Sequence, residues 1–276
     1  MYEGFYGFKT KPFGKTPDPA FLYMSRTHEE ALARLLYAVE EKDIAVLTGE
    51  VGSGKTTLTR ALMDSLGEKY RIILIVNPRL TSLEFIRTVC ARFQCDTGSA
   101  YKSDLIEALY ARVYEDYRAG ITPVVIIDEA HLIPYRETFE EIRLLTNFQL
   151  DDTNLLSLIL VGQPELRRKL ESEHLAALRQ RIGLFCHLGK IEEDEIARYI
   201  GYRISAGGRD NPLFTGRAMT ALHRYAEGIP RVINSLATMA LLEGFARDAE
   251  KIDEDIVSTA AKEIGLNGYR KNQKEK

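Results

Sequence analysis

Cysteine is scarce in this chain: it occurs only at positions 90, 95 and 186. The number is odd, and the spacing is not that of ligands arranged around a metal ion. The sequence therefore argues against a disulfide framework and against a cysteine-based metal site. We expect the three thiols to pack in the core of a protein from a reducing compartment.

A large excess of charge of either sign is also missing. The chain has 37 basic and 40 acidic residues among 276, which gives a formal net charge of −3. A basic surface covering the whole molecule, of the kind that binds nucleic acid or an anionic membrane, is therefore excluded. A local basic patch remains open.

Long hydrophobic runs are absent as well. The longest, such as residues 155–162, are far too short to cross a bilayer. The first residues, Met1-Tyr2-Glu3-Gly4, have neither the basic start nor the apolar stretch of a signal peptide. We expect a cytoplasmic protein, and contact with the inner membrane would be made through a partner or through sequence that is not in this chain.

Short apolar runs alternate with helical patterns through the first two thirds of the chain. This alternation predicts an α/β domain at residues 25–189, with a parallel sheet covered on both faces. From 190 to 265 the pattern is helical only, which predicts an all-α lid domain. The runs expected to form strands are 44–47, 71–76, 123–127, 155–161 and 184–188. Helices are expected at about 27–41 and at 58–66, 82–93, 103–119, 139–150, 164–170, 173–181, 192–204, 215–227, 232–249 and 253–264.

The two ends of the chain have a different character. Residues 1–24 are rich in aromatic residues, glycine and proline, without helical or strand periodicity. We expect an extended arm on the domain surface, because disordered segments are usually poor in aromatic residues. It could cover part of a nucleotide base or only pack on the core. Residues 266–276 are polar and basic, which predicts a frayed tail.

A glycine-rich loop, Gly49-Glu50-Val51-Gly52-Ser53-Gly54-Lys55-Thr56, follows the first expected strand and opens a helix. Its glycines allow backbone N–H groups to surround phosphate oxygens, and the helix dipole adds positive potential. Lys55 can reach the β- and γ-phosphates, and the Thr56 hydroxyl can bind Mg²⁺. We place Thr57, the next residue, in the same nucleotide-binding set. A plain glycine turn is the alternative, but strand and helix fall where a phosphate loop requires them.

Two carboxylates end the third expected strand, in Val124-Val125-Ile126-Ile127-Asp128-Glu129. On a buried parallel strand, Asp128 emerges at the carboxyl edge of the sheet, where open α/β sheets bind ligands. Asp128 can hold Mg²⁺ through water, and Glu129 can polarise the water that attacks the γ-phosphate. The alternative is an acid pair that caps a helix.

Gln163 follows the fourth expected strand and would reach the same edge. Its amide could orient the attacking water or bind the phosphate, or the residue could simply begin a helix before Pro164. For Arg179 and Arg181, composition alone favours surface salt bridges. Arg231, which follows Gly228-Ile229-Pro230, could reach the phosphates or lie on the surface.

Taken in order, these parts resemble an AAA+ ATPase. The loop at 49–56 corresponds to Walker A, residues 124–129 to Walker B, and Gln163 to sensor 1. Residues 179–181 correspond to the arginine-finger region, and Arg231 to sensor 2. The resemblance is narrower than the superfamily and points to the ExeA or general-secretion-pathway A type, similar in turn to ATPases that assist DNA transposition. The motifs that carry it are Phe8-x4-Phe13-x3-Pro17-Asp18-Pro19-x-Phe21-Leu22-Tyr23, Leu47-Thr48 with the loop, Ile127-Asp128-Glu129-Ala130-His131, Leu160-Val161-Gly162-Gln163-Pro164-Glu165-Leu166 and Gly228-Ile229-Pro230-Arg231-Val232-Ile233-Asn234.

The resemblance implies a five-stranded sheet of order 5-1-4-3-2, a helical lid, and hydrolysis of ATP with Mg²⁺ at the interface of an oligomer. It implies an arginine supplied by the neighbouring subunit, which Arg181 matches best, with Arg179 as the second choice. Secretion members of the group commonly continue into a transmembrane helix and a peptidoglycan-binding module, whereas this chain stops at Lys276. For His131, where some relatives have Gln or Asn, we expect local hydrogen bonding.

Three roles are open for such an ATPase. The resemblance favours an assembly motor for a secretion or pilus machine, acting on an unidentified protein partner. A DNA-associated ATPase is the alternative, since Arg167-Arg168-Lys169 and the lysines at positions 9, 11 and 15 could line a DNA path. The third is a nucleotide-gated switch that hydrolyses little.

Overall fold

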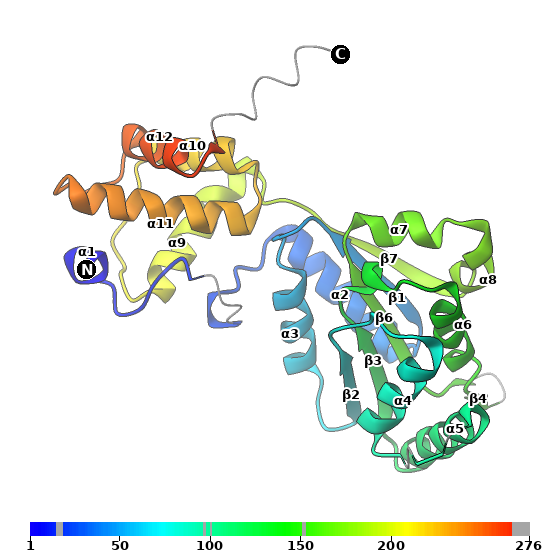
Figure 1. Cartoon of the computed structure of the whole chain (residues 1–276). Coiled ribbons are helices and arrows are strands. Elements are labelled where there is room, and N and C mark those ends of the chain that lie inside the picture. Colours follow the sequence, from blue (N-terminus) through cyan, green and yellow to red (C-terminus); the bar gives the residue numbers. More distant parts are fainter. Residues whose placement is uncertain (15–18, 96–97, 100, 151–152, 267–276) are drawn as a thin grey trace. The chain divides into compact units, whose positions relative to one another are not determined.

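The computed structural model describes residues 1–14, 19–95, 98–99, 101–150 and 153–266. The chain divides into two compact units (Figure 1). The helical unit comprises Met1–Thr27, Gly52–Thr57 and Gly189–Lys276, and the sheet unit comprises His28–Val51 and Leu58–Leu188. Each unit has a hydrophobic core of its own.

The sheet has five strands, and every neighbouring pair is parallel. Their spatial order is β2-β3-β6-β1-β7, which is 5-1-4-3-2 when the strands are counted along the chain, so the order implied by the resemblance is confirmed. Strands β1 and β6 are buried along their whole length, as strands covered on both faces must be. The strands are β1 (Ile44–Gly49), β2 (Tyr70–Ile75), β3 (Thr122–Ile127), β6 (Ser157–Gly162) and β7 (Ile182–Leu188).

Helices pack against this sheet through leucine, isoleucine, valine and phenylalanine side chains. Helix α4 contacts β2, and α5 contacts β3. Asp116 on α5 is buried and accepts two hydrogen bonds from the Arg71 guanidinium on β2. The helices associated with the sheet are α2 (Arg26–Glu40), α3 (Lys55–Ser65), α4 (Ser82–Phe93), α5 (Lys102–Arg118), α6 (Arg136–Leu145), α7 (Pro164–Leu170) and α8 (Ala176–Arg179), with 3-10 turns η2 (Ala130–Leu132) and η3 (Glu173–Leu175).

One predicted helix is shorter than expected. The sequence predicted a helix over 139–150, but α6 ends at Leu145. The Thr146 hydroxyl donates to the Arg143 carbonyl oxygen, and a threonine that bonds the backbone in this way favours the end of a helix. The chain beyond forms a small antiparallel ladder between β4 (Gln149–Leu150) and β5 (Thr153–Asn154), which the sequence did not predict.

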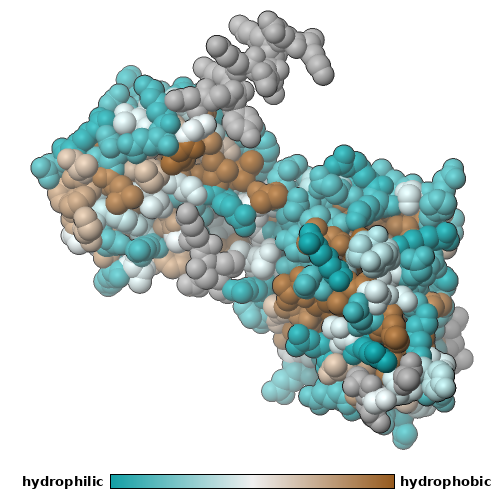
Figure 2. Space-filling model, in the orientation of Figure 1, coloured by the Kyte–Doolittle hydropathy of each residue, from teal (hydrophilic) through white to brown (hydrophobic). Residues whose placement is uncertain are grey.

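The helical unit is built from α9 (Ile196–Ala206), α10 (Gly216–Ala226), α11 (Pro230–Ala246) and α12 (Glu254–Glu263), together with the 3-10 turn η4 (Glu193–Glu195). Their buried faces form one core. Figure 2 shows hydrophobic residues in patches among hydrophilic ones on the visible face of each unit. Among the described residues, no helix is long and apolar enough to cross a membrane.

The N-terminal arm belongs to this core. Tyr2, Tyr6, Phe8 and Phe13 are buried in it, so the described part of the arm packs on a core, one of the two alternatives left open. The expectation of an extended arm is wrong for α1 (Tyr2–Tyr6), which is helical, and a further 3-10 turn, η1, covers Pro19–Phe21. The tail from residue 267 onward and Pro17-Asp18 of the arm motif lie outside the described residues.

Arg203 on α9 holds the arm in place. Its guanidinium donates to the carbonyl oxygens of Pro12, at 2.8 Å, and Phe21, at 2.9 Å. The same group lies over the Phe21 ring, 5.1 Å from its centroid. A buried arginine is stable here because backbone oxygens and an aromatic face replace water around the charge.

Candidate nucleotide-binding site

The polar motifs of the sheet unit meet at one edge of the sheet. Strand β1 ends at Gly49, the first residue of the glycine-rich loop, and Asp128 comes directly after β3. Gln163 comes directly after β6, which lies between β1 and β3. Because parallel strands have their carboxyl ends at the same edge, three motifs that are far apart in the sequence begin side by side.

The loop has the backbone of a phosphate cradle. Gly52 and Gly54 have φ values of 83° and 104°, which residues with side chains rarely adopt. Helix α3 begins at Lys55, so its first N–H groups are directed toward the loop. The Ser53 hydroxyl oxygen is buried and has no hydrogen-bond partner among the residues that the structure describes. A phosphate oxygen would supply the missing partner, so the loop fits this ligand.

The side chains that follow in the loop differ in exposure. Lys55 is buried, Thr57 is half-buried, and Thr56 is exposed. A buried ammonium group next to a glycine-rich loop suits a ligand with several negative charges. An exposed hydroxyl beside it can bind a hydrated metal ion that arrives with such a ligand.

The two carboxylates after β3 have different surroundings. Asp128 is buried, and its Oδ1 accepts the Glu129 N–H at 2.8 Å. Glu129 has a left-handed backbone, with φ 53°, and 38% of its side chain is exposed. One acid is therefore held in a fixed place and the other is open to water.

These acids do not form a metal cage by themselves. The described residues contain no group of three or more His, Cys, Asp or Glu side chains that could hold a metal ion. Mg²⁺ typically binds proteins through one or two carboxylates and completes its shell with water and substrate phosphates. Asp128 offers one such carboxylate to an ion that arrives with a nucleotide.

Gln163 is the N-cap residue of α7, and its side chain makes no capping hydrogen bond. Its backbone N–H donates to His131 Nδ1 at 3.3 Å. Lys169, on the same helix, donates to the carbonyl oxygens of His131 and Ile133. Burial lowers the pKa of Lys169. Helix α7 is therefore bound to the segment that carries the acid pair.

The three candidate arginines lie in different places. The Arg231 N–H, at the start of α11, donates to the Gly52 carbonyl oxygen at 3.2 Å. Arg179 donates to the Glu171 carbonyl oxygen at 3.0 Å. Arg181 donates to the Thr146 hydroxyl at 2.6 Å.

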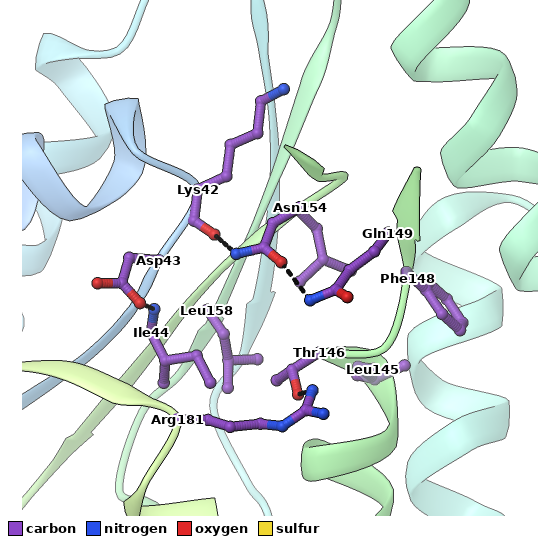
Figure 3. A pocket seen from close by; sticks show the side chains of 11 residues that line it. Lys42, Asp43, Ile44, Leu145, Thr146, Phe148, Gln149, Asn154, Leu158 and Arg181 are labelled. Atoms are coloured by element: carbon purple, nitrogen blue, oxygen red, sulfur yellow. Dashed lines mark hydrogen bonds between the residues drawn. The ribbon is translucent and has the colours of Figure 1, made fainter. Parts of the chain in front are cut away.

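Arg181 borders a cavity of about 140 Å³ that also includes Lys42 and Asp43 (Figure 3). The cavity is lined by Ile44 and Leu158, at the amino ends of β1 and β6. Arg181 itself directly precedes β7. It therefore lies at the opposite edge of the sheet from Gly49, Asp128 and Gln163.

Comparisons with known proteins agree with this geometry. Residues 39–170 match the family model of the AAA domain. The ORC2 protein of Aeropyrum pernix has a TM-score of 0.64 at 21% identity, over 93% of this chain and 72% of that one. Cdc6p of Pyrobaculum aerophilum has a TM-score of 0.67 at 15% identity, over 90% and 71%. Residues 39–170 are an AAA domain, and the chain has the AAA+ P-loop fold.

One curated relative is more similar in sequence than the proteins of these two structures. The AAA+ protein is 39% identical over 270 residues to general secretion pathway protein A of Aeromonas hydrophila. The match covers 96% of this chain and 48% of the relative, so the chain spans about half the length of that protein. The AAA+ P-loop fold and the similarity to the secretion-pathway A type, both expected from the motifs, are confirmed.

For two residues of the candidate site, Ser53 and Lys169, sequence reasoning did not predict the surroundings that the structure shows. Ser53 was only part of the loop motif, and nothing in its pattern indicated a buried hydroxyl without a partner. Lys169 was grouped with a basic run, although it binds the carbonyl oxygens behind the acid pair. His131 makes the local hydrogen bond that was expected of it. Its position two residues after Glu129 was the signal.

Proposed function

We propose that this AAA+ protein binds ATP with Mg²⁺ and, as part of an oligomer, hydrolyses the bond between the β- and γ-phosphates. The main support is the meeting of the glycine loop, the acid pair and Gln163 at one sheet edge. The Ser53 hydroxyl without a partner adds to it, because it lies where a phosphate oxygen would bind.

The roles follow from chemistry. Residues 49–57 hold the phosphates through backbone N–H groups, and Lys55 offsets the charge on the β- and γ-phosphates. Thr56 and Asp128 would hold Mg²⁺, which supplies charge neutralisation on the phosphate oxygens when bound. Glu129, partly exposed, polarises the attacking water. Gln163 orients that water, and Arg231 binds phosphate from the helical unit.

Arg181 is assigned to the site of a neighbouring subunit. It lies at the amino edge of its own sheet, and β1 is six residues long, so the two edges are about 16 Å apart. An arginine side chain cannot span that distance within one subunit. An arginine supplied by a neighbour stabilises the charge that develops during phosphoryl transfer, and it makes hydrolysis dependent on assembly.

The cellular role we propose is that of a motor or switch for a secretion-type envelope machine. It rests on the similarity to general secretion pathway protein A. The basic run named for DNA does not support the alternative, because its members are engaged within the chain. Arg167 pairs with Glu171 and Arg168 with Glu165, while Lys169 donates to two carbonyl oxygens.

Steady-state ATP hydrolysis by the purified chain, with a fluorescent ATP analogue to measure binding, tests this function. The wild type should bind and hydrolyse ATP only with Mg²⁺. Lys55→Ala should lose binding, and Glu129→Gln should bind ATP without turning it over. Full turnover by Glu129→Gln would reject the assigned base, and binding by Lys55→Ala would reject the assigned loop.

Duplex DNA added over a series of salt concentrations separates the cellular roles. A rate that does not respond to DNA supports the envelope role. Stimulation that falls steeply with salt would replace it with the DNA role, because DNA contacts release counterions. Negligible turnover at every protein concentration, with intact binding, would identify a nucleotide-gated switch instead.

A further inference from the structure

His131 lies between two motifs of the candidate site. Its Nδ1 is 3.3 Å from the backbone nitrogen of Gln163 and 3.4 Å from Oε2 of Glu129. The two neighbours come from different segments, one after β6 and the other after β3. The imidazole side chain is 8% exposed, so water does not take the place of either neighbour easily.

The two neighbours make opposite demands on one nitrogen atom. A backbone N–H can only donate, so Nδ1 must offer a lone pair to Gln163. A carboxylate can only accept, so Nδ1 would need a hydrogen to bind Glu129. While Gln163 donates to Nδ1, that atom has no hydrogen for the Glu129 carboxylate. The carboxylate then lies against the ring edge and accepts no hydrogen bond from Nδ1.

The surrounding contacts fix the backbone that carries the ring. Lys169 donates to the His131 carbonyl oxygen. A Cβ added at Gly162 would lie 3.2 Å from the backbone nitrogen of His131, so the end of β6 lies close against this backbone. Glu129 has a left-handed backbone conformation, which residues other than glycine rarely adopt, and its Oε2 lies beside the ring.

We propose that His131 is a positioning residue for the ATPase proposed above. Its Nδ1 accepts the Gln163 N–H, and its ring lies beside the Glu129 carboxylate and limits the positions that this carboxylate can take when it polarises water. The imidazole thereby links the position of β6 and α7 to the position of the carboxylate of Glu129, the proposed general base. This inference depends on the proposed function, because it assigns a role relative to Glu129.

The experiment compares His131→Ala and His131→Asn with the wild type, in the full chain. The kcat of His131→Ala should fall about 10–100-fold, the range seen when a group that orients a functional residue is removed. The KM for ATP and the affinity for the fluorescent analogue should stay within a few-fold. His131→Asn should recover part of kcat, because its amide oxygen can accept the Gln163 N–H. His174→Ala, at an exposed histidine on η3, is the matched control and should behave as the wild type.

A double mutant tests whether His131 acts through Glu129. If it does, Glu129→Gln combined with His131→Ala should hydrolyse ATP in single turnover as slowly as Glu129→Gln alone. Additive losses would overturn the proposal. It would also be overturned by an unchanged kcat in His131→Ala, by an Asn variant no better than Ala, or by a loss of nucleotide binding equal to the loss of rate.

These outcomes differ from failure of the ATPase proposal. If the wild type does not hydrolyse ATP, or if Glu129→Gln is fully active, the proposed function is wrong. If the wild type is active, Glu129→Gln is inactive and His131→Ala matches the wild type, only the role of His131 is wrong. Thermal melting of each variant shows whether the fold is intact.

Discussion

Gly52 and Arg231 are in direct backbone contact within the helical unit. The Arg231 N–H donates to the Gly52 carbonyl oxygen at 3.2 Å. A Cβ added at Gly52 would lie 2.5 Å from the Arg231 Cβ, which is closer than two carbon atoms that are not bonded can approach. Glycine is therefore required at position 52 for two reasons. The backbone there has a positive φ, and Arg231, at the start of α11, leaves no room for a side chain.

Gly52→Ala should weaken nucleotide binding by on the order of 10-fold or more, which corresponds to about 1.4 kcal/mol. Alanine is strained at φ 83°, and its Cβ would push Arg231 away from the loop. Titration of a fluorescent ATP analogue measures the loss. Gly67→Ala is the control, because no atom lies within 4 Å of its added Cβ. Equal affinities in the two variants would contradict the argument.

Arg181→Ala should lower turnover by on the order of 10³-fold if Arg181 completes the site of a neighbour. Nucleotide binding should persist, because Arg181 lies at the opposite sheet edge from the subunit's own loop. Mixing Arg181→Ala with Glu129→Gln should restore part of the rate, since the second variant still offers its arginine. Arg179→Ala serves as the comparison. No recovery in the mixture would argue against a role between subunits.

Asp116→Asn should destabilise the sheet unit by about 3 kcal/mol. The buried carboxylate accepts bonds from Arg71 at 2.7 and 2.9 Å and lies 3.2 Å from Arg112. The amide would remove the counter-charge of the Arg71 guanidinium and one of the two carboxylates beside Arg112. Urea unfolding measures the change in the free energy of unfolding. Glu115→Gln, at an exposed neighbour, should change it little, and an equal effect of both would refute the buried pair.

Alkaline pH should weaken the fold through Cys90. Burial raises the pKa of this thiol from 9.0 to about 12. Above pH 9 the unfolded chain loses the thiol proton and the folded chain keeps it, so this contribution to stability is full below pH 9 and is lost as pH rises toward 12. Urea unfolding of the wild type and Cys90→Ala over this range tests it. The wild type should lose stability more steeply, and identical slopes would contradict the assignment.

The sequence was sufficient for the five strands of the parallel sheet and for the motifs at their ends. Strand order followed from the resemblance, and the position of Asp128 and Gln163 at strand ends followed from apolar runs of four or five residues. Such runs indicate a buried strand, because helices cover both faces of the sheet and the residues on both faces must therefore be apolar. The end of α6 was missed because a threonine at its end does not change the apolar pattern.

The N-terminal arm shows what patterns of residues cannot report. Its aromatic residues indicated a packed segment, but the short helix α1 and the carbonyl oxygens around Arg203 depend on a partner some 190 residues away. A five-residue helix has too few internal hydrogen bonds to be stable alone. Its conformation is set by the core into which Tyr2 and Tyr6 insert.

The sequence by itself determined which residues could carry phosphate chemistry, because a glycine loop between strand and helix and two acids after a buried strand are local patterns. The tertiary structure decided which residues are in contact. Gly52 contacts Arg231, and His131 contacts both Gln163 and Glu129. Arg181 contacts Thr146 at the edge of the sheet opposite the glycine loop. The reason is physical. Backbone conformation depends on residues close in the chain, whereas these contacts join segments that only the packing of sheet and helices brings together.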